Sequence, residues 1–155
     1  MGSRKPAVEE LFQTFDSGYR GDCNFEDDDQ ISFSLWVGHV LPWVNMFHVT
    51  NEFKGTKAQG ERLNKKGRVK GVSDNIILTP GYEFPFAVIE AKRRDRTKSK
   101  WQPGQREFLN RVASDGGFAA VAYGLDEMKK ALKIHLCGSD DDAIFSAYLE
   151  RNKNE

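Results

Sequence analysis

The stretch Phe86-Ala87-Val88-Ile89-Glu90-Ala91-Lys92 places an acid and a base directly after a run of four apolar residues. A short, continuous apolar run is typical of a strand that is covered on both faces, and successive side chains of a strand point to opposite faces. Glu90 and Lys92 therefore share one face. Ala91 points into the protein and leaves its carbonyl oxygen as a further oxygen ligand. The stretch predicts a buried strand with polar chemistry at its end.

A second predicted strand comes before it and starts with another acid. Gly71-Val-Ser-Asp74 is typical of a turn, Asn75-Ile-Ile-Leu78 of a buried strand, and Pro80-Gly81 of the turn into the Glu90 strand. The resulting β-hairpin carries an acid on each arm. Two carboxylates suit Mg²⁺ or Mn²⁺, and a neighbouring lysine can orient an attacking water. This arrangement indicates phosphodiester hydrolysis; the alternative is an ordinary solvated ion pair on a strand.

Length and composition favour one globular domain. The 155 residues, 39% of them hydrophobic, can bury a sizeable core. The first residues lack the apolar region of a secretion signal, and no apolar stretch approaches the length of a membrane span. Two cysteines without metal-ligand spacing and three isolated histidines give no indication of disulfides or zinc. We expect an intracellular, cytoplasmic protein with no membrane partner.

A net charge of zero conceals two basic segments, one on each side of the acidic positions. Runs of charge are usually solvated loops. Here a polyanionic substrate would have to be held against carboxylates that repel it, which favours phosphate contact instead. We therefore predict nucleic-acid contacts for Lys54, Lys57, Arg62, Lys65, Lys66, Arg68, Lys70, Arg93, Arg94, Arg96, Lys98 and Lys100.

Apolar periodicity and turn residues predict the elements around the hairpin. The expected fold is α/β, a central mixed sheet of about four strands flanked by helices, with a parallel strand-helix-strand crossover after Lys92. The core spans about residues 26–132, between an N-terminal helical extension in 1–21 and a C-terminal helix in 138–155 capped by Ser139. We expect helices over 8–15, 26–41, 105–115, 125–136 and 139–149, a helical turn near 58–63, and strands over 44–49, 75–78, 86–92 and 118–123.

Acidic residues open the helix that begins at position 26. Glu26 and Gln30 share its inward face, while the following aspartates complement the helix dipole. Whether Glu26 or Asp27 contributes the acid of the site stays open. Trp101 lies between Lys100 and Gln102, and we expect it to pack on the sheet edge rather than to stack on a base.

Several of these motifs together resemble the PD-(D/E)xK nuclease superfamily, and specifically its virus-type replication-repair nuclease (VRR-NUC) domains, over roughly residues 26–132. The family's first-helix Glu and Gln resemble Glu26 and Gln30, and the Asp of its second strand resembles Asp74. Ser73 departs from the superfamily, which has Pro there. The Glu-x-Lys of the third strand and the Gln of the following helix resemble Glu90, Lys92 and Gln105.

The resemblance implies a restriction-endonuclease-like core and an endonuclease that uses Mg²⁺ or Mn²⁺ on DNA. Asp74, Glu90, the Ala91 carbonyl and Glu26 would hold the cation; Lys92 would orient the water and Gln105 would steady Lys92 or a phosphate. Stand-alone viral members resemble dimeric Holliday-junction resolvases, which implies branched DNA, a homodimer, the host cytoplasm, and replication, recombination or repair. The alternatives are a monomeric flap or nicking nuclease, an inert DNA-binding module, and a protein-protein adaptor.

Overall fold

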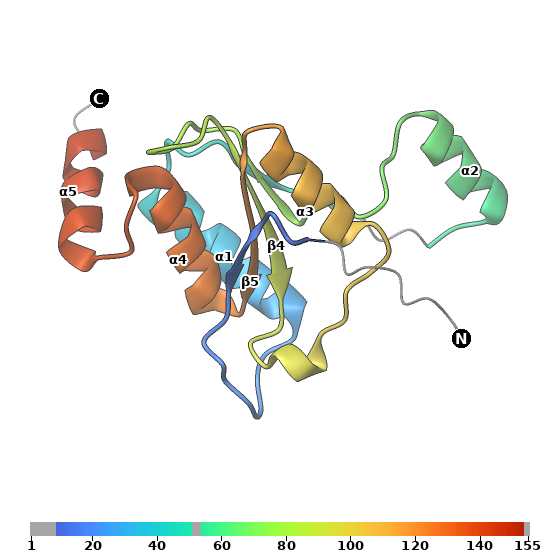
Figure 1. Cartoon of the computed structure of the whole chain (residues 1–155), viewed down its shortest axis with the longest axis horizontal. Helices are drawn as coiled ribbons and strands as arrows, with labels where there is room; N and C mark the ends of the chain where they lie inside the picture. Colours follow the sequence, from blue (N-terminus) through green and yellow to red (C-terminus); the bar gives the residue numbers. More distant parts are fainter. Residues whose placement is uncertain (1–8, 51–53, 154–155) are drawn as a thin grey trace.

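The computed structural model describes residues 9–50 and 54–153, and its centre is a mixed five-stranded sheet (Figure 1). The strands lie in the order β1-β5-β4-β3-β2. Neighbours are antiparallel from β2 to β4 and parallel from β4 through β5 to β1. The central strands β4 and β5 are buried at every position, as expected for apolar strands covered on both faces. The strands are β1 (Gln13–Phe15), β2 (Met46–His48), β3 (Asn75–Ile77), β4 (Ala87–Lys92) and β5 (Phe118–Tyr123).

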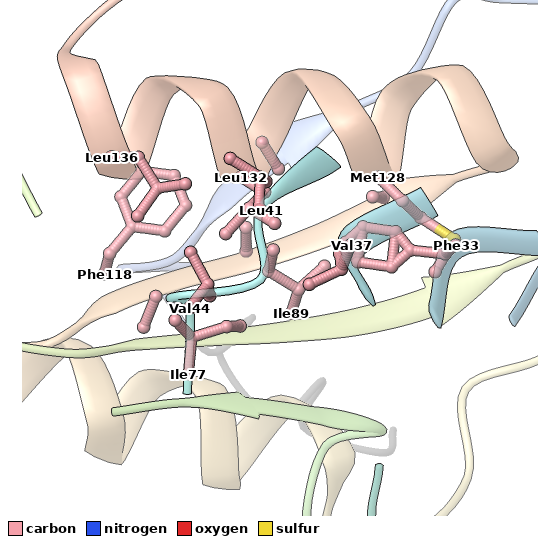
Figure 2. Close-up of a cluster of buried hydrophobic side chains, with 14 of the residues drawn as sticks. Phe33, Val37, Leu41, Val44, Ile77, Ile89, Phe118, Met128, Leu132 and Leu136 are labelled. Atoms are coloured by element: carbon pink, nitrogen blue, oxygen red, sulfur yellow. The ribbon is translucent and has the colours of Figure 1, made fainter. Parts of the chain in front are cut away.

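Helices cover both faces of the sheet and divide the apolar core in two. On one face, α1 (Glu26–Val40) and α4 (Leu125–Cys137) enclose the larger core, where Phe33, Ile89 and Leu132 meet (Figure 2). On the other face, α3 (Gln105–Ser114) packs over Val88 and Val121. Alternate residues of β4 enter the two cores, so Glu90 and Lys92 lie on the α3 face of the sheet. The expected α/β architecture, with its hairpin and parallel crossover, is confirmed.

Two further helices lie outside these layers. The C-terminal helix α5 (Asp142–Lys153) packs on α4 through Phe145. Its first turn is capped by Asp141, whose Oδ1 accepts from the backbone of Ala143 and Ile144, so the prediction of a Ser139 cap is wrong. Helix α2 (Lys57–Lys65) projects from the body on a long loop (Figure 1). Among the described residues, none of the helices combines the length and apolar composition that crossing a bilayer requires.

The predicted N-terminal helix is wrong, because the segment forms the edge strand β1. Gln13–Phe15 pairs in parallel with Ala120–Ala122 of β5 and adds a fifth strand to the expected four. Phe12 and Phe15 are three residues apart, and in a strand they point to opposite faces. Each fills a different core, Phe12 under α3 and Phe15 under α4. A spacing of three residues between apolar side chains thus also fits a strand with both faces buried. Val8, the first residue of the predicted helix, lies outside the described residues.

His135 of α4 is fully buried against Phe118, and its environment predicts a dependence of stability on pH. Its Nε2–H donates to the Thr79 carbonyl at 2.9 Å, while within the described ranges Nδ1 has no partner. Burial lowers the pKa of this imidazole below its ordinary value of 6.5. The folded protein therefore stays unprotonated where the unfolded chain takes up a proton, so stability falls as pH drops below 6.5.

Replacing His135 by glutamine, which does not ionise, should remove this component of the acid sensitivity. Between pH 6.5 and 5, the free energy of unfolding of the wild type should fall faster than that of His135→Gln, by up to about 1.4 kcal/mol per pH unit. Urea denaturation at several pH values measures both slopes. Parallel slopes would contradict a neutral His135 in the folded protein.

Candidate active site

The register of the hairpin sets two carboxylates opposite each other. Asn75 pairs with Ile89, so the next position outward on each strand brings Asp74 opposite Glu90. The backbone N–H of Ala91 donates to Asp74 Oδ2 at 2.8 Å. Because the N–H and C=O of one strand residue point to the same neighbouring strand, the Ala91 carbonyl also faces the Asp74 side. Three of the predicted oxygen ligands therefore gather at the end of the hairpin.

The Glu90 carboxylate is almost fully buried, and only one of its two oxygens accepts a hydrogen bond. Its Oε1 accepts from Gln105 Nε2 at 2.8 Å and lies 3.7 Å from Lys92 Nζ. Its Oε2 has no hydrogen-bond partner in the part of the chain that the structure describes. Burying a carboxylate oxygen without a partner is costly, so such a group points to a ligand.

The Lys92 ammonium is fixed by two hydrogen bonds and lies beside the Glu90 carboxylate. It donates to Gln105 Oε1 at 2.7 Å and to the Lys100 carbonyl at 2.9 Å, and its side chain is only 4% exposed. The Gln105 amide thus joins Lys92 to Glu90, accepting from one and donating to the other. This places Gln105 where it can steady Lys92.

Two glycines bring the Asp74 loop against the start of α3. A Cβ on Gly71 would lie 2.2 to 2.5 Å from the backbone of Gly104 and Gln105, and both glycines have positive φ. Only glycine allows the two backbones to approach so closely in that conformation. The contact holds the loop that leads to Asp74 beside the helix that carries Gln105.

Burial raises the pKa values of both carboxylic acids, and like charge raises that of Glu90 further. The pKa of Glu90 is raised to about 9, first by burial and then by Asp74 and more weakly by Glu26, against the opposing effect of Lys92. Burial also raises the pKa of Asp74. Without a cation, the raised pKa of Glu90 keeps a proton on this pair of acids. A divalent cation between them would replace that proton.

The donor set fits magnesium better than metals that need a complete protein cage. Residues 9–50 and 54–153 contain no group of three or more His, Cys, Asp or Glu side chains placed to hold a metal ion. Asp74 and Glu90 provide a pair, with the Ala91 carbonyl beside them. Mg²⁺ is usually held by one or two carboxylates and keeps several waters or substrate phosphates. The unpartnered Glu90 Oε2 is the atom that such a cation would satisfy.

The start of α1 bears on the choice between the two candidate acids of the first helix. Glu26 is half-buried and acts on the pKa of Glu90, whereas Asp27 is exposed. These observations favour Glu26. Gln30 does not reach the carboxylates. It is buried and forms a pair of amide hydrogen bonds with Asn75, at 2.7 and 2.9 Å, which ties α1 to β3.

A cleft of about 1070 Å³ opens over this site, and part of the predicted basic surface lines it. Its walls include Glu26, Asp74, Lys92 and Gln105. Five of the predicted nucleic-acid contacts also line it, namely Arg68, Lys70, Arg93, Lys98 and Lys100. A further five are exposed on and around α2, namely Lys54, Lys57, Arg62, Lys65 and Lys66.

Two predicted DNA contacts do not line the cleft. The Arg94 guanidinium stacks 3.9 Å from the ring centre of Tyr19, and Arg96 lies 3.6 Å from Asp16. Both side chains hold the segment that follows β1. Arg96 lines a smaller neighbouring pocket together with Lys100.

Several residues of the cleft were not singled out as site residues from the sequence, among them His48 and Phe25. His48 donates from Nδ1 to the Asp74 carbonyl at 2.8 Å and lines the cleft beside it. Phe25 lines the cleft directly before Glu26. The only sign of Phe25 in the sequence is that an apolar residue stands directly before the acidic start of a helix. Trp101 packs on Phe12, with ring centres 5.6 Å apart, as expected for packing on the sheet rather than stacking on a base.

Comparison with solved structures places this fold beside a VRR_NUC domain protein. The two chains are 20% identical and superpose with a TM-score of 0.61, over 74% of this chain and 89% of that chain. Comparisons with known protein families and with curated proteins gave no match. The likeness shows a VRR-NUC-like, restriction-endonuclease-like fold, as the sequence motifs predicted.

Proposed function

We propose, from this nuclease-type fold and the site within it, that the chain is a Mg²⁺- or Mn²⁺-dependent endonuclease that hydrolyses phosphodiester bonds in DNA. The observation that carries the proposal is the buried Glu90 carboxylate. One of its oxygens has no partner in the described part of the chain, Asp74 lies beside it, and the Lys92 ammonium is 3.7 Å away. A purely structural ion pair would have satisfied both oxygens.

In the proposed reaction each residue of the site has a separate role. Asp74, Glu90 and the Ala91 carbonyl would hold the cation, and Glu26 would bind it directly or through water. The bound cation would neutralise charge on the phosphate and favour ionisation of the attacking water. Lys92 orients that water, because two of its three protons are committed to Gln105 and Lys100 and the third remains. Gln105 keeps the ammonium in place.

The proposed substrate is branched DNA, such as a Holliday junction or a flap, met in replication, recombination or repair. Cleavage of a four-way junction on two strands needs two coupled sites and hence a homodimer, whereas flap cleavage or nicking can be done by a monomer. The test compares four-way junction, flap, nicked duplex, linear duplex and single strand, each with Mg²⁺ or Mn²⁺, and sizes the particle in solution. Binding without cleavage of any substrate would instead identify an inert DNA-binding module.

Metal binding can be tested without activity by replacing Glu90 with glutamine. The pKa of Glu90 is raised from 4.5 to about 9, so the folded metal-free protein keeps a proton that the unfolded chain has released. Its stability therefore falls as pH rises through this window, by at most about 1.4 kcal/mol per pH unit. In EDTA at pH 8, Glu90→Gln should unfold at a higher temperature than the wild type.

Adding Mg²⁺ should reverse that order. The cation stabilises the wild type in proportion to its binding, and the glutamine variant should gain little. Thermal unfolding of both proteins in EDTA and over a range of Mg²⁺ concentrations measures this. Equal Mg²⁺ stabilisation of both proteins would place the cation elsewhere.

The exposed cations around α2 should contribute affinity for DNA independent of its sequence. Lys57→Gln, Lys65→Gln and Lys66→Gln together should flatten the plot of log binding constant against log salt by up to about 2.7, since each lost phosphate contact removes about 0.9. The capping box between Thr56 and Gln59 is untouched, so the helix should persist. A control of equal charge change replaces the partly exposed Lys129, Lys130 and Lys133 of α4 by glutamine, and an equal change in both triple variants would contradict a specific role for α2.

A further inference from the structure

Phe25 is a large aromatic side chain that lies open to solvent at the active-site cleft. It is 69% exposed, and it directly precedes Glu26 in the chain. Among the large, exposed apolar side chains of the described residues, it alone lines the cleft. Exposed apolar side chains are ordinary on a protein surface, but one beside catalytic carboxylates has a position that a ligand can use.

The start of α1 gives no folding reason for a phenylalanine here. Phe25 is the N-cap residue, and no side-chain hydrogen bond caps the helix. N-cap positions favour Ser, Thr, Asp and Asn, and the same chain uses Thr56 in a complete capping box at the start of α2. The side chain of Phe25 thus neither caps the helix by a hydrogen bond nor enters the core.

The ring is nevertheless held in place from one side. The Arg93 guanidinium lies 4.8 Å from the ring centre. Arg93 is itself anchored by hydrogen bonds from Nε to the Asn24 carbonyl at 3.1 Å and from a terminal nitrogen to the Cys23 carbonyl at 3.0 Å. One face of an aromatic ring therefore rests on a fixed cation, and the large exposed fraction leaves the ring accessible from the cleft.

We infer that Phe25 is a platform on which an unpaired nucleobase beside the scissile phosphate stacks, and this inference rests on the proposed function. Every base presents a π-face, so stacking on an aromatic side chain does not depend on sequence. A base within a duplex is already stacked on its neighbours and must leave them to reach a protein side chain. The platform selects DNA with an unpaired nucleotide at the cleavage point, and Arg93 adds a positive charge beside it.

The test measures affinity in EDTA, where binding is separated from cleavage. Fluorescence anisotropy compares a continuous duplex with a duplex that carries a single-stranded arm, matched in number of phosphates. Phe25→Leu should weaken binding to the armed DNA by about 5- to 150-fold and leave the duplex unaffected, and Phe25→Trp should keep the preference. An abasic site at the first unpaired nucleotide should reproduce the loss in the wild type and add nothing to Phe25→Leu.

The contrary outcomes are distinct from one another. If the wild type binds neither DNA, the proposed function fails, and the platform fails with it. If the wild type binds both and Phe25→Leu weakens them equally or not at all, the platform is overturned while DNA binding stands. If Phe25→Leu instead changes the sedimentation of the DNA-free protein, Phe25 belongs to a protein interface and the inference is also overturned.

Discussion

Replacing Asp74 by asparagine should abolish DNA cleavage while leaving the protein folded. The amide oxygen of asparagine can still accept the hydrogen bond from Ala91 N–H, so the local geometry persists. The charge that would hold the cation is lost, and we expect a decrease in rate of at least about 10³-fold. Cleavage of the best substrate under single-turnover conditions with saturating Mg²⁺ measures the effect.

The stability of this variant provides an internal check. Burial raises the pKa of Asp74, so a neutral amide should be at least as stable as the carboxylate in metal-free buffer. Asp74→Ala should lose cleavage as well, but it also deletes the acceptor for Ala91 N–H, at a cost of about 1 kcal/mol in stability. Asp115→Asn, a matched change at an exposed position, should leave the rate unchanged. Full activity of purified Asp74→Asn would refute the assignment of the site.

Replacing Lys92 by methionine should reduce cleavage by about 10²- to 10⁴-fold, the range found when a group that transfers or orients a proton is removed. Methionine has a similar length and suits a buried position. It cannot donate to Gln105 Oε1 or to the Lys100 carbonyl, and it leaves Glu90 without a neighbouring cation. Unlike Asp74→Asn, this variant should also be less stable, by about 1–3 kcal/mol for the unpaired acceptors.

Measuring the dissociation constant for DNA beside the cleavage rate separates a role of Lys92 in catalysis from a role in DNA binding. Lys92 is buried at the base of the cleft, so its loss should change the single-turnover rate far more than the dissociation constant for DNA. Lys130→Met, at a partly exposed lysine of α4 that lies 3.8 Å from Asp140, should change neither quantity. An equal decrease in affinity and rate for Lys92→Met would make Lys92 a phosphate contact instead of the residue that orients water.

The hairpin could be predicted from the sequence because strand periodicity is local. Turn residues on both sides of Asn75–Ile77 and an apolar run before Glu90 were enough to predict a hairpin with an acid on each arm. The period of two then put Lys92 on the same face as Glu90, and the register of the structure adds that Asp74 lies opposite Glu90. The role of Gln105 was predicted from the resemblance to VRR-NUC domains. The strand side chains could be predicted because each is oriented by its own strand.

Features that depend on contacts distant in sequence could not be predicted. The spacing of Phe12 and Phe15 is the same for a helix as for an edge strand between two cores, and only pairing with β5 decides between them. Arg94 and Arg96 belong to a basic run, but their side chains contact Tyr19 and Asp16 and do not line the cleft. The cation beside Phe25 likewise comes from a distant strand end, so the contact between Arg93 and that ring could not be predicted from the local sequence.

The pairing of β1 with β5 has a consequence for how the molecule is made. Gln13 to Phe15 leave the ribosome early, but their partners Ala120 to Ala122 are synthesised only after α1, α2 and the hairpin. The first strand must therefore wait unpaired until most of the chain has emerged, and closing so long a loop is a slow step in folding. Until then the side chains of Phe12 and Phe15 are exposed apolar surface, so nascent chains of this protein can associate wrongly with one another.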